Sequence, residues 1–227
     1  MAVGGVIYLS ILATTTQQYV NEWKDDQTLW LRAVDIFPYQ SVVAYLNLGD
    51  SYYRNKKYND ALKHYKTALG IDPTNIDAME HIAKVNLRLK NDVLAEYYRK
   101  QLVIHNPESP KAHIILGDHY YQNKNLPLAN TYYLKALYLE PLNTDAIFKN
   151  AVMDSNRHNY RDAMTKIDYI LKLERDHVGA LQLLAQIHFN EGRLDDSIRV
   201  AKKLLKIEPR DKFAYDLLDH IDTKGTL

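Results

Sequence analysis

Histidines and paired aspartates are the residues of this chain whose chemistry could support catalysis or metal binding. Nine histidines are scattered along the 227 residues, and His113 and His119 are six positions apart, not the three or four that place two residues on one helix face. The pairs Asp25–Asp26 and Asp195–Asp196 are adjacent, so in a helix their carboxylates would point about 100° apart. We therefore interpret each pair as a helix start or a solvated surface, not as a catalytic dyad.

Established catalytic motifs are missing from the sequence. It contains no HExxH, no glycine-rich phosphate loop, no GxSxG and no EF-hand loop. The absence of cysteine excludes disulfides, thiol catalysis and cysteine metal ligands, but it leaves the redox compartment open. A net charge of +1 with 25% charged residues does not indicate a nucleic-acid binder, which is normally basic. We predict a protein that is not an enzyme and that uses no metal, no cofactor and no nucleic acid.

The side chains that remain must be positioned by a helical hairpin that recurs along the chain. In its clearest copy, residues 42–75, apolar spacing predicts a helix over 42–54 and a second over 58–69, joined by the polar turn 55–57. Pro73 follows the second helix, where its fixed φ and missing N–H oppose further helix. Small residues at Gly49 and Ala61 are expected to let the two helices approach closely.

The same marks recur at one constant spacing along the chain. Prolines stand at Pro73, Pro107, Pro141 and Pro209. The small residue of the first helix recurs as Gly49, Ala83, Gly117, Ala151 and Ala185, and that of the second helix as Ala61, Ala95, Ala129, Ala163 and Ser197. This pattern resembles the tetratricopeptide repeat, a helix–turn–helix unit of about 34 residues. The resemblance covers about three quarters of the chain and predicts five repeats, 42–75, 76–109, 110–143, 144–177 and 178–211.

The resemblance implies an all-α, right-handed superhelix of stacked hairpins. After the fifth repeat, residues 212–227 are predicted to form a capping helix and tail, which would cover the apolar face that the last repeat leaves exposed. Before the first repeat, residues 22–40 are predicted to contain a degenerate half-repeat helix.

The segment 1–21 at the start of the chain is uncharged and largely apolar. Its most apolar part, residues 2–13, is shorter than the roughly 20 residues that cross a bilayer. A signal peptide is not indicated, because no basic residue precedes the segment and no clear cleavage site follows it. Three interpretations stay open: the end of a membrane helix, an anchor in its own right, or a helix that packs on the first repeat.

A second resemblance extends the membrane interpretation. An apolar segment, then Trp23 and Trp30, then a helix ending at Pro38 before the repeats resembles membrane glycosyltransferase-like proteins with a C-terminal tetratricopeptide tail. This resemblance implies a regulatory or substrate-presenting tail and transfers no catalytic residue. Asp25–Asp26 follow the segment, so the positive-inside tendency does not pull the repeats to the cytosol. We expect a membrane-associated chain with periplasmic or lumenal repeats, and a soluble cytoplasmic protein is the alternative.

The first helix of each hairpin lines the concave face in the tetratricopeptide family, with positions 2, 5, 9, 12 and 13 pointing into the groove. The resemblance therefore implies a groove that binds a protein or a peptide. Its candidate residues are Asp50, Tyr53, Arg54, Glu80, Lys84, Arg88, Asp118, Tyr121, Phe148, Gln182, Gln186 and Phe189. Aromatic rings beside basic side chains favour a peptide interface. The alternative is that each ring packs on the next hairpin.

Five of these residues are expected to form one continuous patch: Tyr53, Arg54, Lys84, Arg88 and Tyr121. Some family members bind a C-terminal carboxylate with Lys and Asn at positions 5 and 9, where this chain has Leu46 and Asp50, so that ligand is not expected. Besides the binding module and the glycosyltransferase tail, a scaffold that self-associates through its apolar first segment remains an alternative.

Overall fold

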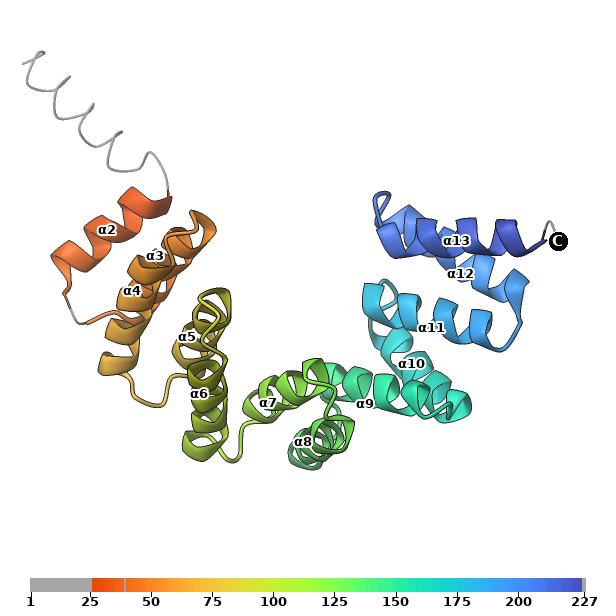
Figure 1. The fold of residues 1–227 in the computed structure, drawn as a ribbon, viewed down its shortest axis with the longest axis horizontal. Coiled ribbons are helices and arrows are strands. Elements are labelled where there is room, and N and C mark those ends of the chain that lie inside the picture. The colour runs from red at the N-terminus through yellow and green to blue at the C-terminus, as the bar shows by residue number, and fades with distance from the viewer. Residues whose placement is uncertain (1–25, 39, 226–227) are drawn as a thin grey trace, which may run out of the picture. The chain divides into compact units, whose positions relative to one another are not determined.

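Short helices alternate with tight turns throughout the computed structural model, which describes residues 26–38 and 40–225. The chain divides into two compact units, residues 1–107 and 108–227, and each is treated by itself. The described part of the first unit contains α2 (Asp26–Ile36), α3 (Val42–Arg54), α4 (Tyr58–Ile71), α5 (Ile76–Arg88) and α6 (Asp92–His105). The second contains α7 (Pro110–Gln122), α8 (Leu126–Leu139), α9 (Thr144–Asn156), α10 (Tyr160–Leu173), α11 (Val178–Asn190), α12 (Leu194–Ile207) and α13 (Lys212–Gly225) (Figure 1).

The predicted all-α fold is confirmed, because every regular element within these described residues is a helix. Helix α4 continues two residues past the predicted end at 69, since the N–H of Asp72 still bonds the carbonyl of Ala68 at 3.0 Å. The apolar segment 1–21 and residues 22–25 lie outside the described residues. Among the residues that are described, no helix is long and apolar enough to cross a membrane.

A side-chain cap fixes the start of each first helix. The residue before the helix accepts a hydrogen bond from the backbone N–H three positions on, which satisfies a donor that the helix itself leaves free. The caps follow the period of the repeats: Ser41, Asn75, Ser109, Asn143, His177 and Asp211. Because Asp211 continues this series, α13 begins as the first helix of a sixth hairpin would.

The turn inside each hairpin is also repeated. One residue per turn adopts the left-handed conformation, with φ between 59° and 74°: Lys56, Lys90, Lys124, His158 and Gly192. In the first hairpin the N–H of Lys57 then bonds the carbonyl of Tyr52 at 2.9 Å, which satisfies a carbonyl at the end of α3. The chain therefore reverses at the same point in every repeat.

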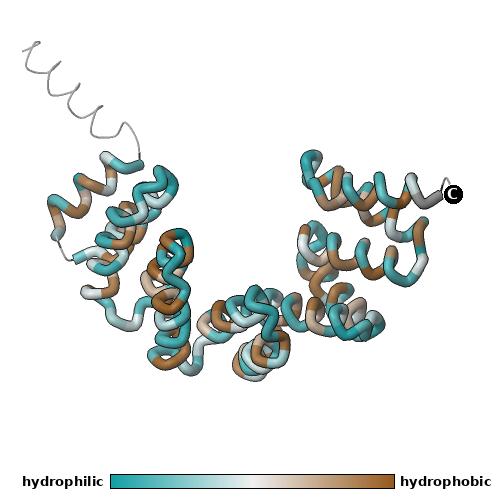
Figure 2. Tube along the Cα trace, viewed as in Figure 1, coloured by the Kyte–Doolittle hydropathy of each residue, from teal (hydrophilic) through white to brown (hydrophobic). Residues whose placement is uncertain are grey.

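Small residues lie where the two helices of a hairpin face each other. Ala61, Ala129 and Ala163 are fully buried, as their spacing predicts. At Gly49 and Gly117 the close neighbour is a tyrosine ring: an added Cβ would lie 2.4 Å from the ring of Tyr65 and 2.6 Å from the ring of Tyr133, respectively. Figure 2 shows hydrophilic and hydrophobic residues alternating along the helices, as expected for amphipathic helices that bury one side.

Candidate functional site

In the first unit the buried Tyr65 links a groove candidate of the first repeat to the second repeat. The Tyr65 hydroxyl donates to the Asp50 carboxylate at 2.6 Å, and the His81 ring stacks on the Tyr65 ring with 4.9 Å between centroids. Burial and the Asp50 carboxylate both raise the pKa of Tyr65. The His81 Nδ1 atom lies 3.7 Å from Asp50, and Arg88 donates to the Tyr53 hydroxyl at 3.0 Å. These contacts bring together α3, α4 and α5.

The same arrangement recurs in the second unit, on α7, α8 and α9. The Tyr133 hydroxyl donates to Asp118 at 2.7 Å, and the Lys149 ammonium binds the other Asp118 oxygen at 3.0 Å. Asn156 donates to the Tyr121 hydroxyl at 3.3 Å, where the first unit has Arg88 on Tyr53. Tyr53 and Tyr121, at position 12 of their repeats, thus accept hydrogen bonds from the neighbouring hairpin through their hydroxyl groups. Part of each ring stays exposed.

Three further candidates of the first unit have charged partners. Arg54 is exposed and pairs with Asp26 of α2 at 3.1 Å. Glu80 and Lys84 pair with each other at 2.5 Å along α5. Because the five residues of the expected continuous patch are divided between the two units, that patch remains a prediction.

Phe148 of the fourth repeat and Gln182 of the fifth each contact the start of the next first helix in the stack. The Phe148 ring lies against Gly179 and contacts the His177 ring, with 5.3 Å between centroids. The Gln182 amide donates to Asp211 at 2.8 Å, so it supports the cap of α13. These contacts favour a positioning role for Gln182, whereas Phe148 keeps a partly exposed face.

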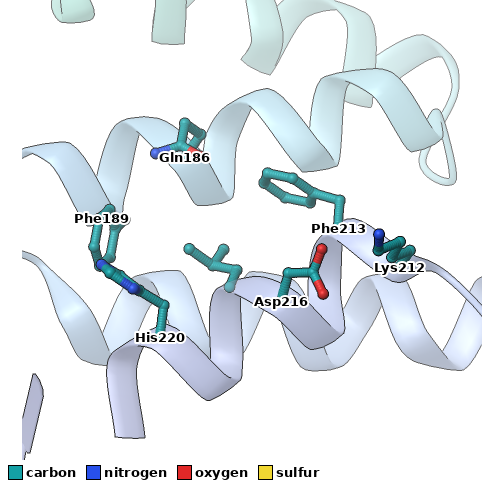
Figure 3. Close-up of a pocket in the computed structure, with 7 residues that line it drawn as sticks. Gln186, Phe189, Lys212, Phe213, Asp216 and His220 are labelled. Atoms are coloured by element: carbon teal, nitrogen blue, oxygen red, sulfur yellow. The ribbon is translucent and has the colours of Figure 1, made fainter. Parts of the chain in front are cut away.

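A concave site of about 570 Å³ lies between α11 and α13 (Figure 3). Helix α11 contributes Gln186 and Phe189, and α13 contributes Lys212, Phe213, Asp216, Leu217 and His220. The Phe189 and His220 rings meet edge to face, with 5.4 Å between centroids. Among the described residues, no hydrogen bond or ion pair engages the side-chain charges of Lys212 and Asp216, so both are available to a ligand.

The α13 residues of this site were not predicted from the sequence, because residues 212–227 were interpreted only as a capping helix and tail. The register of the repeats was the signal that could have found them. It continues from Asp211 into α13 and places Phe213, Asp216 and His220 at positions 2, 5 and 9 of a sixth first helix. These are groove positions in the earlier repeats.

The acidic and histidine side chains of the described residues form no metal-binding cluster. Across residues 26–38 and 40–225, no group of three or more His, Asp or Glu side chains is arranged to hold a metal ion. The carboxylates Asp50 and Asp118 are already bonded to tyrosine hydroxyls. The groove side chains described above are aromatic rings, amides and charged groups.

Family models identify the repeating hairpin from the sequence. Two tetratricopeptide repeat models match the chain, one over residues 42–75 and the other over residues 90–144 and 155–212. Together they cover more than half of the chain and fall on the hairpins just described. The chain therefore belongs to the tetratricopeptide repeat family.

Among individual proteins, the chain is 25% identical over 189 residues to protein O-mannosyl-transferase Tmtc3 of Drosophila melanogaster, a match that covers 82% of the chain and 19% of Tmtc3. The chain spans no more than half of the curated relatives it matches. Yeast Tom70 superposes with a TM-score of 0.75 at 16% identity, covering 88% of this chain and 43% of Tom70. YrrB, described as a tetratricopeptide repeat protein with an unusual peptide-binding site, superposes with a TM-score of 0.54 at 16% identity over 84% of this chain and 97% of its own. These likenesses show the superhelical repeat fold.

Proposed function

We propose that this chain binds a peptide or a segment of another protein along the side chains of its first helices. The observation that carries this proposal is the concave site between α11 and α13, where two partly exposed phenylalanines lie beside Lys212 and Asp216, whose charges have no partner among the described residues. Protein interfaces concentrate their binding energy in such aromatic residues at the centre of a concave patch, with polar groups at the rim.

The lining residues suit a peptide for a further reason. Phe213 and Leu217 are apolar residues of the lining, which also includes the Gln186 amide and the charges of Lys212 and Asp216. Figure 3 shows Phe213, Lys212 and Asp216 on the same helix, facing the helix that carries Gln186. An apolar side chain on Phe213 and Leu217 would leave the backbone of the ligand within reach of these polar groups. The site is open, as a site for a chain that enters and leaves at two ends must be.

The test is to select binders from a random dodecapeptide library with the whole chain and to measure the affinity of the enriched peptides by fluorescence anisotropy. Phe213→Ala is expected to weaken binding by at least tenfold, because truncating a central aromatic anchor typically costs about 2 kcal/mol or more. The matched control is Tyr138→Ala, which removes a ring that is 78% exposed on the second helix α8. Melting temperatures must stay within a few degrees for both variants. Loss of binding by Tyr138→Ala but not by Phe213→Ala would place the function on the outer helices.

The similarity to Tmtc3 supports a second candidate function. Most of this chain aligns with a protein named as an O-mannosyl-transferase, while it spans about a fifth of that protein. In this candidate the repeats are the regulatory or substrate-presenting part of a membrane-bound transferase and lie on its periplasmic or lumenal side. The gene sequence before residue 1 tests this candidate. Several hydrophobic segments encoded upstream in the same reading frame would support it, and an in-frame stop codon directly upstream of residue 1 would contradict it.

A further inference from the structure

A second concavity, of about 180 Å³, lies within the second unit beside the Tyr133–Asp118 pair. It is lined by Asp118, Tyr121, Tyr133, Phe148, Lys149 and Val152. Pockets for small organic ligands usually measure about 300–1,000 Å³. This concavity is smaller, and its volume suits one side chain of a longer ligand.

The walls of this concavity are already fixed by the protein. The Tyr121 hydroxyl accepts a hydrogen bond from Asn156, and the Phe148 ring is held against Gly179 and His177. Val152 adds an apolar side chain to the lining. A site whose side chains are ordered before binding loses less conformational entropy when the ligand arrives.

The charges of the site disfavour an anionic ligand. The Asp118 carboxylate accepts hydrogen bonds from the Tyr133 hydroxyl and the Lys149 ammonium. The Asp145 carboxylate lies nearby on α9. Partial burial raises the pKa of Asp145; the Lys149 charge opposes this and the Asp118 charge adds to it. A further negative charge would meet the repulsion of both carboxylates.

Lys149 still has hydrogen-bonding capacity in this site. Its ammonium group carries three N–H donors, and among the described residues its one hydrogen bond goes to Asp118. Its side chain is 25% exposed, so a ligand can reach the remaining donors. A neutral carbonyl oxygen can accept from Lys149 without adding charge beside Asp118.

We propose that this concavity binds one uncharged apolar side chain of a peptide, while Lys149 donates a hydrogen bond to a backbone carbonyl of the same peptide. The inference rests on the proposed function and names the chemistry of one subsite within it. It predicts a recognition motif in which a single apolar position is required and an acidic residue at that position is rejected.

The experiment uses peptides enriched from the random dodecapeptide library on the whole chain. Val152→Trp, which fills the concavity, should weaken their binding at least tenfold. Replacing the shared apolar residue of the peptide by Ala should cost a similar factor, and the two losses should not multiply when combined, because both remove the same contact. Glutamate at the same peptide position should bind more weakly than Ala. The matched control is Lys172→Trp, on the exposed side of the second helix α10, which should leave the affinity unchanged.

Lys149 is tested by Lys149→Met and Lys149→Arg. The methionine variant should bind the peptide more weakly than wild type. The arginine variant should keep the wild-type affinity, because a backbone carbonyl needs only a hydrogen-bond donor at that place. Melting curves separate this effect from the support that Lys149 gives to Asp118.

The outcomes separate this inference from the proposed function. If the enriched peptides ignore Val152→Trp but lose affinity with Phe213→Ala, the subsite inference is wrong and peptide binding stands on the α11–α13 site. If an acidic residue is preferred at the position that Val152→Trp affects, the proposed ligand chemistry is wrong. If no peptide is enriched at all, the subsite and the proposed function both fail.

Discussion

Hairpin α3–α4 in the first unit and hairpin α7–α8 in the second share a buried tyrosine and an aspartate. Gly49 and Gly117 leave room for the tyrosine rings, and the tyrosine hydroxyls then reach the aspartates that follow these glycines. The hairpin between them has Ala83, Lys84 and Arg99 at the corresponding positions. The two hairpins therefore share a local device that recurs at twice the repeat length and skips the hairpin between them.

A stack of three rings strengthens the likeness. In hairpin α3–α4 the His64 ring lies between Tyr45 and Tyr52, with centroids 6.1 and 5.1 Å away. In hairpin α7–α8 a tyrosine takes the middle place: the Tyr132 ring lies 6.0 Å from His113 and 5.5 Å from Tyr120. The geometry of the stack is kept while histidine and tyrosine exchange places.

The difference between the two regions comes from the helix that follows each hairpin. Helix α5 places His81 3.7 Å from Asp50 and adds the Glu80–Lys84 ion pair. Helix α9 places Lys149 3.0 Å from Asp118 and has Phe148 and Val152 at the positions of that ion pair. The hairpin therefore provides a common packing arrangement, and the first helix of the next hairpin determines whether the surface beside it is charged or apolar.

Replacing the glycines that both hairpins share should reduce the stability of the protein most. Gly117→Leu should lower the free energy of unfolding by about 3 kcal/mol or more, because an added Cβ already lies 2.6 Å from the Tyr133 ring and the remaining atoms have no room. Gly49→Leu should be at least as damaging, since the distance to Tyr65 is 2.4 Å. Urea unfolding followed by circular dichroism measures both.

A third glycine provides the control for these variants. An added Cβ at Gly70, near the end of α4, would meet nothing within 4 Å. Gly70→Ala should therefore stabilise the protein by up to about 1 kcal/mol, because alanine favours helix. An unchanged melting temperature for Gly117→Leu would show that the tyrosine ring is not held as described.

Removing each of the two aspartates tests whether their different cationic partners contribute differently to stability. Asp118→Ala removes the acceptor of a buried hydroxyl and the partner of Lys149, and should cost about 2 kcal/mol. Asp50→Ala should cost less, about 1 kcal/mol, because its second partner, His81, is 3.7 Å away. Equal losses would mean that the Lys149 contact adds nothing. Unfolding free energies at pH 7.5 and two salt concentrations give the comparison.

The fold was predictable because its determinants are local and periodic. Prolines, small residues and apolar stripes recur from one hairpin to the next. The same pattern also packs neighbouring hairpins together, as where Tyr65 of the first hairpin meets Ile82 and Val85 of the second. The site was predictable only in part, because position in the repeat says which way Asp50 or Gln182 points but not which neighbour it meets. Gln182 bonds the cap Asp211 of the next helix, and only the packed structure brings these two together. Phe213 and Asp216 were missed because the register was stopped one helix too early.

The ring stacks should respond differently to pH. Burial lowers the pKa of His64 below its usual value; the Lys63 charge adds to this and Asp60 opposes it. The native state therefore binds fewer protons than the unfolded chain near pH 6, so this contribution to stability is complete above about pH 6.5 and is lost as the pH falls below it. His64→Tyr copies the middle ring of the α7–α8 stack and should reduce the loss of stability between pH 7.5 and 5.5.

The readout for His64 is the difference between wild type and variant, because burial also lowers the pKa of His188 in the second unit. The His188 contribution is present in both proteins and cancels. A pH dependence that is the same with and without His64 would show that its ring is protonated as easily in the native state as in the unfolded chain.

The smallest effect concerns a place where the two hairpins do not differ at all. Lys56 and Lys124 both adopt φ 59°, a left-handed conformation that costs a residue with a Cβ about 1 kcal/mol or more. Glycine removes this cost but gives the unfolded chain more freedom, so Lys56→Gly and Lys124→Gly should each stabilise the protein by no more than about 1 kcal/mol. Because neither lysine side chain is buried and the backbone angles agree, the two gains should be equal, unlike the effects at Asp50 and Asp118. Gly192→Lys, at φ 74° with open space around its Cβ position, should produce a loss of similar size in the fifth repeat. Unequal gains at Lys56 and Lys124 would show that the turns, and not only the following helices, distinguish the two regions.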